Sequence, residues 1–262
     1  MEIQGNTIYI TGAAGGIGSA IAEACVKAGA HVALFDKDTE KLALLAEHLH
    51  RLSSTSQIVP VVADLATEAG VQSGIEEALA AFAGQVGVLV SNLGVLITGA
   101  FEESTLQDWQ QSMALNFFTH VWAIRAVLPY MQQRHQGHIV LMGSDQGRQP
   151  DRGLGAYAAA KAAVHSLTKT LAQELPQYGI TINCLAPGMT KTPLVDALMA
   201  TLAQEYGTDV REAERQEIER RGIPLGRLGK PPEVAQAVLF LIQNSFSHGI
   251  ILPLDGGNTR GM

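Results

Sequence analysis

The sequence predicts an α/β protein with one doubly wound domain, in which helices cover both faces of a parallel sheet of about seven strands. The 262-residue chain is 47% apolar and 16% charged, so it has enough aliphatic material for a single core. Short runs that are apolar on both faces alternate with longer segments of helical periodicity, which is typical of buried parallel strands and their crossover helices. No linker or repeat divides the chain, so residues 1–262 are expected to form one domain.

The predicted elements alternate strictly along the chain. The strand candidates are residues 7–11, 31–35, 58–62, 88–91, 138–142, 181–185 and 250–252. The helical patterns between them cover residues 16–28, 39–52, 68–82, 105–134, 157–178, 197–221 and 233–243. Consecutive parallel strands need right-handed crossovers, so this order predicts a doubly wound sheet.

Residues 189–223 form the segment least suited to packing in the core. Pro193 opens a charged amphipathic region that ends in Arg220 and Arg221. A solvated surface helix is one interpretation. The other is a mobile lid that covers a substrate site, and we adopt it as a prediction.

The overall charge excludes several classes of function. The formal net charge is −7 and no run of Lys or Arg interrupts it, so a nucleic-acid partner is not expected. The apolar stretches are too short to span a membrane and the N-terminus does not resemble a secretory leader, which favours a cytoplasmic protein. The eight histidines are scattered without ligand spacing, so no metal site is predicted.

A glycine-rich turn follows the first predicted strand and leads into a helix. Its sequence is Thr11-Gly-Ala-Ala-Gly-Gly-Ile-Gly18. In this context Gly12 allows the sharp turn, Gly16 lets backbone approach a pyrophosphate and Gly18 lets the helix pack closely on the strand. The free N–H groups of the helix then face the anion. A Rossmann dinucleotide site is therefore expected, with Ala14, Gly15 and Ile17 among its contacts.

The ends of three further predicted strands point to the same site. Asp36 ends the second strand 24 residues after Gly12, near the spacing of an acid that binds the adenosine ribose hydroxyls. Because a carboxylate there repels a 2′-phosphate, NAD is favoured over NADP. Asp64 and Leu65 follow the third strand, where they are expected at the adenine, and Asn92 and Gly94 follow the fourth, where backbone can lie against the cofactor.

The strongest chemical signal is Tyr157-Ala-Ala-Ala-Lys161 in a helical pattern, with Ser144 at the end of the fifth predicted strand. The spacing puts phenol and ammonium on one helix face. A tyrosine pKa of about 10 must fall by roughly 2–3 units, or about 3–4 kcal/mol, to act as a base near neutral pH. One cation about 4 Å from the phenolate stabilises it by about 4 kcal/mol, so the charge of Lys161 is expected to be nearly sufficient to lower the tyrosine pKa by this amount. The alternative is an exposed helical pair without a chemical role.

Together these segments resemble the short-chain dehydrogenase/reductase family. The resemblance rests on residues 11–18, 64, 92–94, 116, 144, 157–161, 183–188 and 255–257. It implies that Tyr157 is the acid and base, that Lys161 lowers its pKa and binds the nicotinamide ribose, and that Ser144 positions the substrate oxygen. It also implies a water-linked proton relay through Asn116. Four further residues are expected around the nicotinamide: Pro187, Gly188, Thr190 and Thr192.

The chain also departs from the family pattern. The usual Asn-Asn-Ala-Gly reads Ser91-Asn-Leu-Gly94, which loses an amide that braces the centre of the sheet. Gly143 stands where many relatives have a serine before the catalytic serine. No basic residue occurs between Ala13 and Gly15, where phosphate-preferring relatives often carry one, and this strengthens the expectation of NAD.

The loop between Ser144 and Tyr157 is expected to form one wall of the substrate pocket. Gln146, Arg148 and Arg152 could bind a hydroxylated or anionic group, so a sugar- or polyol-like secondary alcohol or ketone is predicted. Surface arginines paired with Asp145 and Asp151 are the alternative. Reduction of a 3-oxoacyl thioester and a non-catalytic NAD-binding redox sensor remain as other functions. The resemblance also implies a homo-oligomer, most simply a tetramer, and a small-molecule substrate as the other partner.

Overall fold

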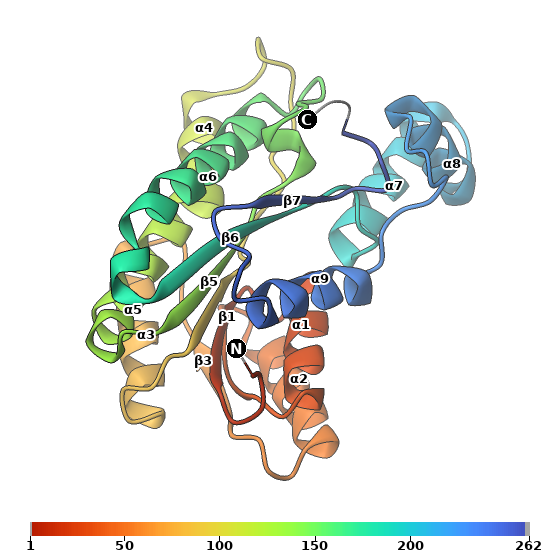
Figure 1. Cartoon of the computed structure of the whole chain (residues 1–262). Coiled ribbons are helices and arrows are strands. Elements are labelled where there is room, and N and C mark those ends of the chain that lie inside the picture. The colour runs from red at the N-terminus through yellow and green to blue at the C-terminus, as the bar shows by residue number, and fades with distance from the viewer. Residues whose placement is uncertain (1, 260–262) are drawn as a thin grey trace.

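The computed structural model describes residues 2–259 and confirms the predicted fold class. Seven parallel strands form one sheet in the order β3-β2-β1-β4-β5-β6-β7 (Figure 1). The strands are β1 (Thr7–Thr11), β2 (His31–Asp36), β3 (Ile58–Val62), β4 (Val88–Ser91), β5 (Gly137–Met142), β6 (Ile180–Pro187) and β7 (Ile251–Leu254). The order reverses between β1 and β4, and a doubly wound sheet binds its ligands at the carboxyl ends of the strands beside such a point.

Helices cover both faces of this sheet, and each face has its own apolar core. On one face α1 (Gly16–Lys27), α2 (Thr39–Leu52) and α9 (Pro231–Gln243) pack on the strands. On the other lie α3 (Glu68–Ala81), α5 (Thr119–Arg134) and α6 (Gly155–Glu174). The helix α4 (Leu106–Met113) packs against α6. Both faces are thus apolar, which explains why the strand sequences lack a polar alternation.

Two predicted helices have a different form in the structure. Residues 197–221 form two helices, α7 (Pro193–Tyr206) and α8 (Val210–Arg221), because Gly207 takes a left-handed conformation with φ of +64° and Asp209 caps the next helix. Residues 105–134 form α4, a π-helical turn (Ala114–Phe118) and α5 in unbroken succession. The π turn places Asn116 at its centre, as such turns often do for functional residues.

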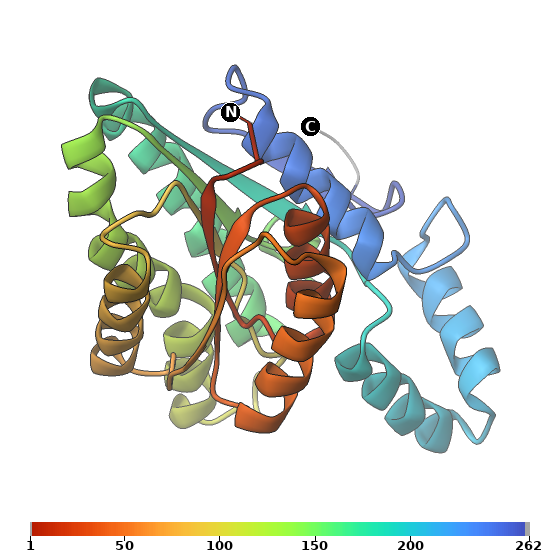
Figure 2. The ribbon, with the colours of Figure 1, turned by 90° about the horizontal axis from the view of Figure 1, so that it is seen from below.

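The helices α7 and α8 form an arm that projects from the rest of the domain. Figures 1 and 2 show this pair beyond the carboxyl end of β6, apart from the helices that cover the sheet. Thr192 caps α7 by accepting a hydrogen bond from the Val195 N–H. No helix among residues 2–259 is long and apolar enough to cross a membrane.

Candidate active site

Hydrogen bonds from the loop after β4 fix the glycine-rich turn after β1. The Asn92 side-chain amide donates to the carbonyls of Thr11 and Gly12 at 3.1 and 3.2 Å, and the Asn92 N–H donates to Thr11 Oγ1 at 2.9 Å. A Cβ on Gly18 would lie 2.1 Å from the Gly12 carbonyl oxygen, so only glycine permits α1 to pack so closely on β1. Asn92 thus keeps the turn in place.

The start of α1 offers free backbone donors to an anion. Gly15 occupies the capping position without a side-chain hydrogen bond, and the first turn carries no acidic residue. The N–H groups of an uncapped helix start favour a phosphate. A Cβ on Gly16 would lie 3.0 Å from the Thr192 side chain, so the missing side chain also admits the start of α7.

Asp36 and Asp64 lie at the carboxyl ends of β2 and β3, on the same edge of the sheet as the glycine turn. The Asp36 carboxylate accepts hydrogen bonds from the Ala14 N–H at 3.1 Å and the Asp38 N–H at 3.2 Å. This ties Asp36 directly to the glycine turn. Asp64 is exposed and accepts from the Ala66 N–H, while Leu65 is buried beside it.

Asn116 lies fully buried in its π turn and faces the start of the loop after β4. Its Oδ1 accepts from the Val95 N–H at 2.9 Å and its Nδ2 donates to Ser112 Oγ at 3.2 Å. A Cβ on Gly94 would lie 3.1 Å from Asn116 Oδ1 and 3.3 Å from Lys161 Nζ, so both side chains border Gly94. The geometry brings Asn116 and Lys161 to one point.

Ser144, Tyr157 and Lys161 border a common cavity. Ser144 follows the end of β5 by two residues. Tyr157 and Lys161 lie one turn apart on α6, and Lys161 Nζ is 5.8 Å from the centre of the tyrosine ring. Lys161 is 2% exposed and donates to the Met142 carbonyl at 2.8 Å. The exposed helical pair considered as an alternative is therefore wrong.

Burial governs the pKa values of Tyr157 and Lys161. Desolvation raises the pKa of Tyr157 to about 12, opposed by a hydrogen bond with Ser144 and assisted by the charge of Asp145. Desolvation also lowers the pKa of Lys161 to about 8. The charge of Lys161 thus does not offset the burial of the tyrosine as expected, because the lysine is itself desolvated and its hydrogen bond goes to Met142.

The departures from the family pattern have local structural reasons. The Ser91 hydroxyl lies 2.7 Å from His120 Nδ1, so a buried histidine replaces the missing amide at the sheet centre. Burial and the charge of Lys161 hold the pKa of His120 well below its usual value. A Cβ on Gly143 would lie 2.6 Å from Cys184 Sγ and 2.7 Å from His165 Nε2, which leaves no room for a serine there in this arrangement.

The common cavity has a volume of about 490 Å³ and lies between the strand ends and the arm. Twelve of the predicted site residues line it: Ile17, Asn92, Gly94, Ser144, Gln146, Arg152, Tyr157, Lys161, Pro187, Gly188, Thr190 and Thr192. Its outer wall is formed by apolar side chains of α7, namely Leu194, Val195, Leu198 and Leu202, with charged residues of both arm helices at one end. Asp36, Asp64, Leu65 and most of the glycine turn lie outside this lining, and Arg148 is exposed and also outside it.

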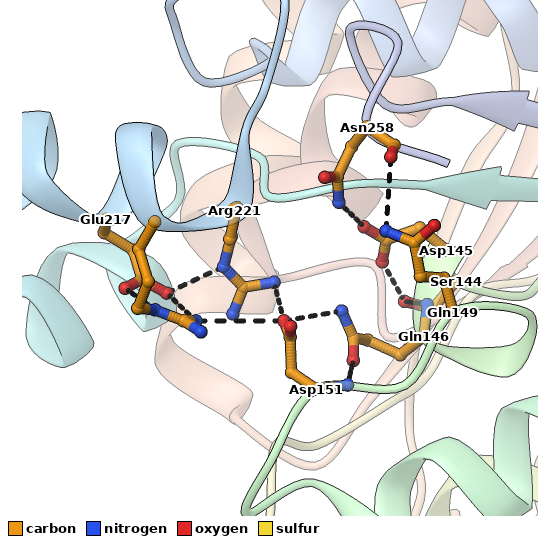
Figure 3. A network of polar contacts seen from close by, with 9 residues as sticks. Ser144, Asp145, Gln146, Gln149, Asp151, Glu217, Arg221 and Asn258 are labelled. Carbon is orange, nitrogen blue, oxygen red and sulfur yellow. Dashed lines mark hydrogen bonds and ion pairs between the residues drawn. The ribbon is translucent and has the colours of Figure 1, made fainter. Parts of the chain in front are cut away.

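A polar network joins the loop between Ser144 and Tyr157 to the arm (Figure 3). Arg221 of α8 pairs with Asp151 at 2.5 Å and with Glu217 at 2.7 Å, and the side chains of Arg221 and Glu217 are 8% and 4% exposed. The Gln146 side chain binds Asp151 through both of its groups, at 2.7 and 3.1 Å. Asp151 therefore has its ion partners on α8, and the alternative in which it pairs with the arginines of its own loop is wrong.

Two residues that sequence reasoning left out of the site complete it. Asp145, predicted only as a surface partner of an arginine, is 4% exposed and accepts from Ser144 Oγ at 3.0 Å. Asn258, beyond β7, donates to the second Asp145 oxygen at 3.1 Å. Among residues 2–259, no three His, Cys, Asp or Glu side chains gather as a metal site would require.

The fold and this site define a nucleotide-dependent oxidoreductase class, and the comparison with known families agrees. The family model for short chain dehydrogenases matches residues 6–203. The chain belongs to the short-chain dehydrogenase/reductase family.

Three relatives illustrate its place in the family. A 2,3-dihydro-2,3-dihydroxybenzoate dehydrogenase of Bacillus subtilis (strain 168) is 35% identical over 263 residues, 99% of this chain and 98% of that protein. The structure of L-sorbose reductase from Gluconobacter frateurii, complexed with NADPH and L-sorbose, is 29% identical with a TM-score of 0.94 and all of both chains covered. Levodione reductase is 28% identical with a TM-score of 0.92 and 99% of both chains covered. The chain is therefore an enzyme of a family that acts on alcohols and ketones.

Proposed function

We propose that this protein transfers a hydride between NAD and the carbinol or carbonyl carbon of a polar secondary alcohol or ketone. One observation carries the proposal: Ser144, Tyr157 and Lys161 border a single cavity that also reaches the start of α1, where backbone donors are free. A nucleotide bound at the start of α1 would thus meet the acid and base group and the substrate in one place.

The residues around α1 suit a dinucleotide. The free N–H groups at the start of α1 would take the pyrophosphate, and Asp36 the adenosine ribose. Asp64 and Leu65 would lie by the adenine, with Asn92 and Gly94 further along the cofactor. Pro187, Gly188, Thr190 and Thr192 line the cavity where the nicotinamide would lie. When bound, the oxidised nicotinamide supplies the carbon that accepts hydride and a positive charge. NAD is proposed although the sorbose reductase structure contains NADPH, because Asp36 would face a 2′-phosphate.

Tyr157 moves the proton in this scheme. In the oxidation direction its phenolate takes the hydroxyl proton of the substrate, and in reduction its phenol returns that proton to the carbonyl oxygen. Ser144 holds the same oxygen by a hydrogen bond and need not act as a nucleophile. Lys161 adds positive charge beside the phenol, and Asn116 would anchor a water that links Lys161 to solvent. Burial raises the pKa of Tyr157, and the positive charge of an oxidised nicotinamide beside it would favour the phenolate.

The proposed substrate is a sugar- or polyol-like compound. Arg152, Gln146 and Ser144 line the cavity, and Arg220, Arg221, Glu205 and Glu217 lie around its end near the arm. The apolar wall from α7 would cover the carbon skeleton, so residues 189–223 would act as a lid. The dihydrodiol and sorbose named for two relatives are also hydroxylated rings or chains.

Replacing Tyr157 by Phe tests the mechanism. We expect turnover of an alcohol panel to fall by about 10³-fold or more while the affinity for NAD, measured by calorimetry, changes little. Unchanged turnover would refute the role of Tyr157. A wild-type protein that binds NAD but turns over no alcohol or ketone would favour the redox sensor.

The substrate panel separates the remaining alternatives. It contains sugars, cyclic diols, steroids, long aliphatic ketones and a 3-oxoacyl thioester, each assayed with both cofactors. Preference for polyols with NAD is the expected result. Turnover of only steroids or aliphatic ketones contradicts the polar substrate, and a preference for the thioester with NADPH supports the reductase alternative.

A further inference from the structure

Asp145 is a buried carboxylate in direct contact with the serine of the proposed mechanism. It begins the short 3₁₀ turn (Asp145–Gly147) that follows Ser144, and it lines the main cavity. Its Oδ1 accepts a hydrogen bond from Ser144 Oγ at 3.0 Å, and its Oδ2 accepts one from Asn258 Nδ2 at 3.1 Å (Figure 3). Both carboxylate oxygens are therefore acceptors while the group is ionised.

The hydrogen bonds of Ser144 leave no hydrogen for a substrate in this arrangement. A serine hydroxyl has one hydrogen to donate and two lone pairs to accept with. The Gln146 N–H donates to one lone pair at 3.2 Å, and the single hydrogen goes to Asp145. Tyr157, whose pKa a Ser144 hydrogen bond lowers, competes with Asp145 for the same hydrogen. A substrate carbonyl or developing alkoxide needs a donor, so ionised Asp145 competes with it for the Ser144 hydrogen.

A neutral Asp145 reverses this arrangement. A protonated carboxyl would donate its own hydrogen to the second lone pair of Ser144 Oγ, and its carbonyl oxygen would still accept from Asn258. Ser144 would then accept two hydrogen bonds and direct its one hydrogen into the cavity. The proton that Asp145 gains comes from solvent, and no covalent bond to carbon changes.

We propose that Asp145 is a positioning residue whose ionisation state decides whether Ser144 can donate its hydrogen bond to the oxygen of the substrate. The inference rests on the proposed function of Ser144 and extends it, because it makes the use of the serine conditional on a second group. It also gives Asn258 a role, since its amide holds the carboxyl in the required orientation.

The surroundings of Asp145 make its neutral form accessible. Burial raises its pKa above the usual value, and this outweighs the opposing hydrogen bonds from Asn258 and Ser144 and the charge of Arg221 on α8. Tyr157 on α6 faces the same carboxylate, whose charge contributes to the high tyrosine pKa. Asp255, after β7, lies behind Gly188, which also borders Asp145.

The sign of the pH effect follows from these contacts. Below the pKa of Asp145 the Ser144 hydrogen is available, and as the pH rises through that pKa it is diverted to the carboxylate. Substrate affinity is therefore expected to weaken with rising pH through this ionisation. At any one pH, the ionisation of Asp145 should change kcat/KM for oxidation and kcat/KM for reduction by the same factor, because one transition state serves both directions.

Asp145→Asn is the direct test. An asparagine can accept from Asn258 with its oxygen and donate to Ser144 Oγ with its nitrogen, which is the hydrogen-bond pattern of the neutral acid. With the best alcohol and ketone of the panel, the variant is expected to lose the Asp145 step from its pH profile. Above that step it should exceed the wild type, by up to about 10²-fold if a full donor to the substrate oxygen is restored.

Two further variants separate positioning from a structural role. Asn258→Ala removes a donor that favours the ionised form, so the step should move to higher pH. Asp255→Asn removes a neighbouring negative charge without touching the Asn258 amide, so the step should stay in place or move to lower pH, opposite to the shift in Asn258→Ala. A uniform loss of activity at all pH values in Asp145→Asn and Asn258→Ala, with the wild-type profile retained, would overturn the proposal.

An infrared titration provides a readout that needs no substrate. A protonated carboxyl band that titrates in the wild type and is missing in Asp145→Asn supports the proposal. Absence of any such band at every pH where the protein stays folded overturns it. A wild type that shows the band but turns over no alcohol or ketone would instead refute the proposed function, so the two failures are distinguishable.

Discussion

Asp36 is the residue on which the choice between the two nicotinamide cofactors depends. Its carboxylate is already fixed by the N–H groups of Ala14 and Asp38, so it cannot move aside without losing both hydrogen bonds. A 2′-phosphate would add negative charge beside it, and adjacent like charges cost several kcal/mol. Asp36→Ala is therefore expected to shift the ratio of kcat/KM for NAD over NADP towards NADP by about tenfold or more.

The nearby carboxylate of Asp38 provides the control for this change. Asp38 caps α2 and pairs with Lys41, so Asp38→Ala should lower stability modestly without altering the cofactor ratio. Steady-state kinetics with both cofactors and thermal unfolding measure the two effects. A wild type that already prefers NADPH would contradict the argument from Asp36.

Residues were predictable where their chemistry is local in sequence. Tyr157 and Lys161 follow from a four-residue spacing, and Ser144 and Asp36 from their places at strand ends. The hydrogen bond between Asp145 and Asn258 was not predictable, because Asn258 is 113 residues further along the chain and no pattern links the two. The pKa of Tyr157 was not predictable either, since it depends on burial that only the packed site creates.

At the level of elements, apolar periodicity predicted the strands but not the irregular helices. The predicted strand bounds agree with the observed ones within a few residues, because each of the seven buried apolar runs is short and clearly delimited in the sequence. In the π turn at Asn116 the backbone N–H groups donate to different carbonyls than in an α-helix. The apolar pattern of the sequence stays intact, so periodicity does not reveal this turn. The break at Gly207 carried a signal in the glycine and in the Asp209 cap, which the charged pattern of the region obscured.

The position of α8 is expected to depend on the ion pair between Arg221 and Asp151, because the pair between Arg221 and Glu217 lies within the helix. When Arg221 is replaced, Glu217 keeps two hydrogen bonds from Arg220, and Asp151, which is 24% exposed, keeps Arg220 at 3.9 Å. Both carboxylates retain a cation, so Arg221→Gln is expected to lower stability by less than the roughly 3–5 kcal/mol that an uncompensated buried charge costs. It should also raise KM more than it lowers kcat, because the same contact shapes the substrate loop through Gln146.

Arg215 on the same helix is the matched control. It pairs with Glu212 and Glu219 at the surface, where water and salt screen an ion pair so that it contributes little to stability. Thermal unfolding, limited proteolysis around Gly207 and substrate kinetics of Arg215→Gln should resemble those of the wild type. If Arg221→Gln and Arg215→Gln behave alike, the ion pairs do not hold the arm.

For the whole molecule, the fold explains why so few residues determine the reaction. All strands are parallel, so their carboxyl ends bring the glycine turn, Asn92 and Ser144 to one edge of the sheet. The helix α6 then carries Tyr157 and Lys161 to the same edge. The arm of α7 and α8 adds the remaining wall of the cavity, so sequence differences there can change its shape without disturbing the residues proposed for hydride transfer.

The family resemblance of the sequence implies that several copies of this chain assemble into an oligomer. The π turn and α5 carry a small aromatic surface, in which Phe118 is 43% exposed and stacks on Trp122 with ring centres 5.9 Å apart. Exposed aromatic side chains of this kind are enriched at protein interfaces. We therefore expect a homo-oligomer, most simply a tetramer, that buries Phe118.

Light scattering after size-exclusion chromatography should show Phe118→Asp as a smaller species than the wild type. Phe246→Asp is the control, because Phe246 is 98% exposed outside these helices and its replacement should leave the mass unchanged. A monomeric wild type, or an unchanged mass for Phe118→Asp, would show that this surface is not an interface.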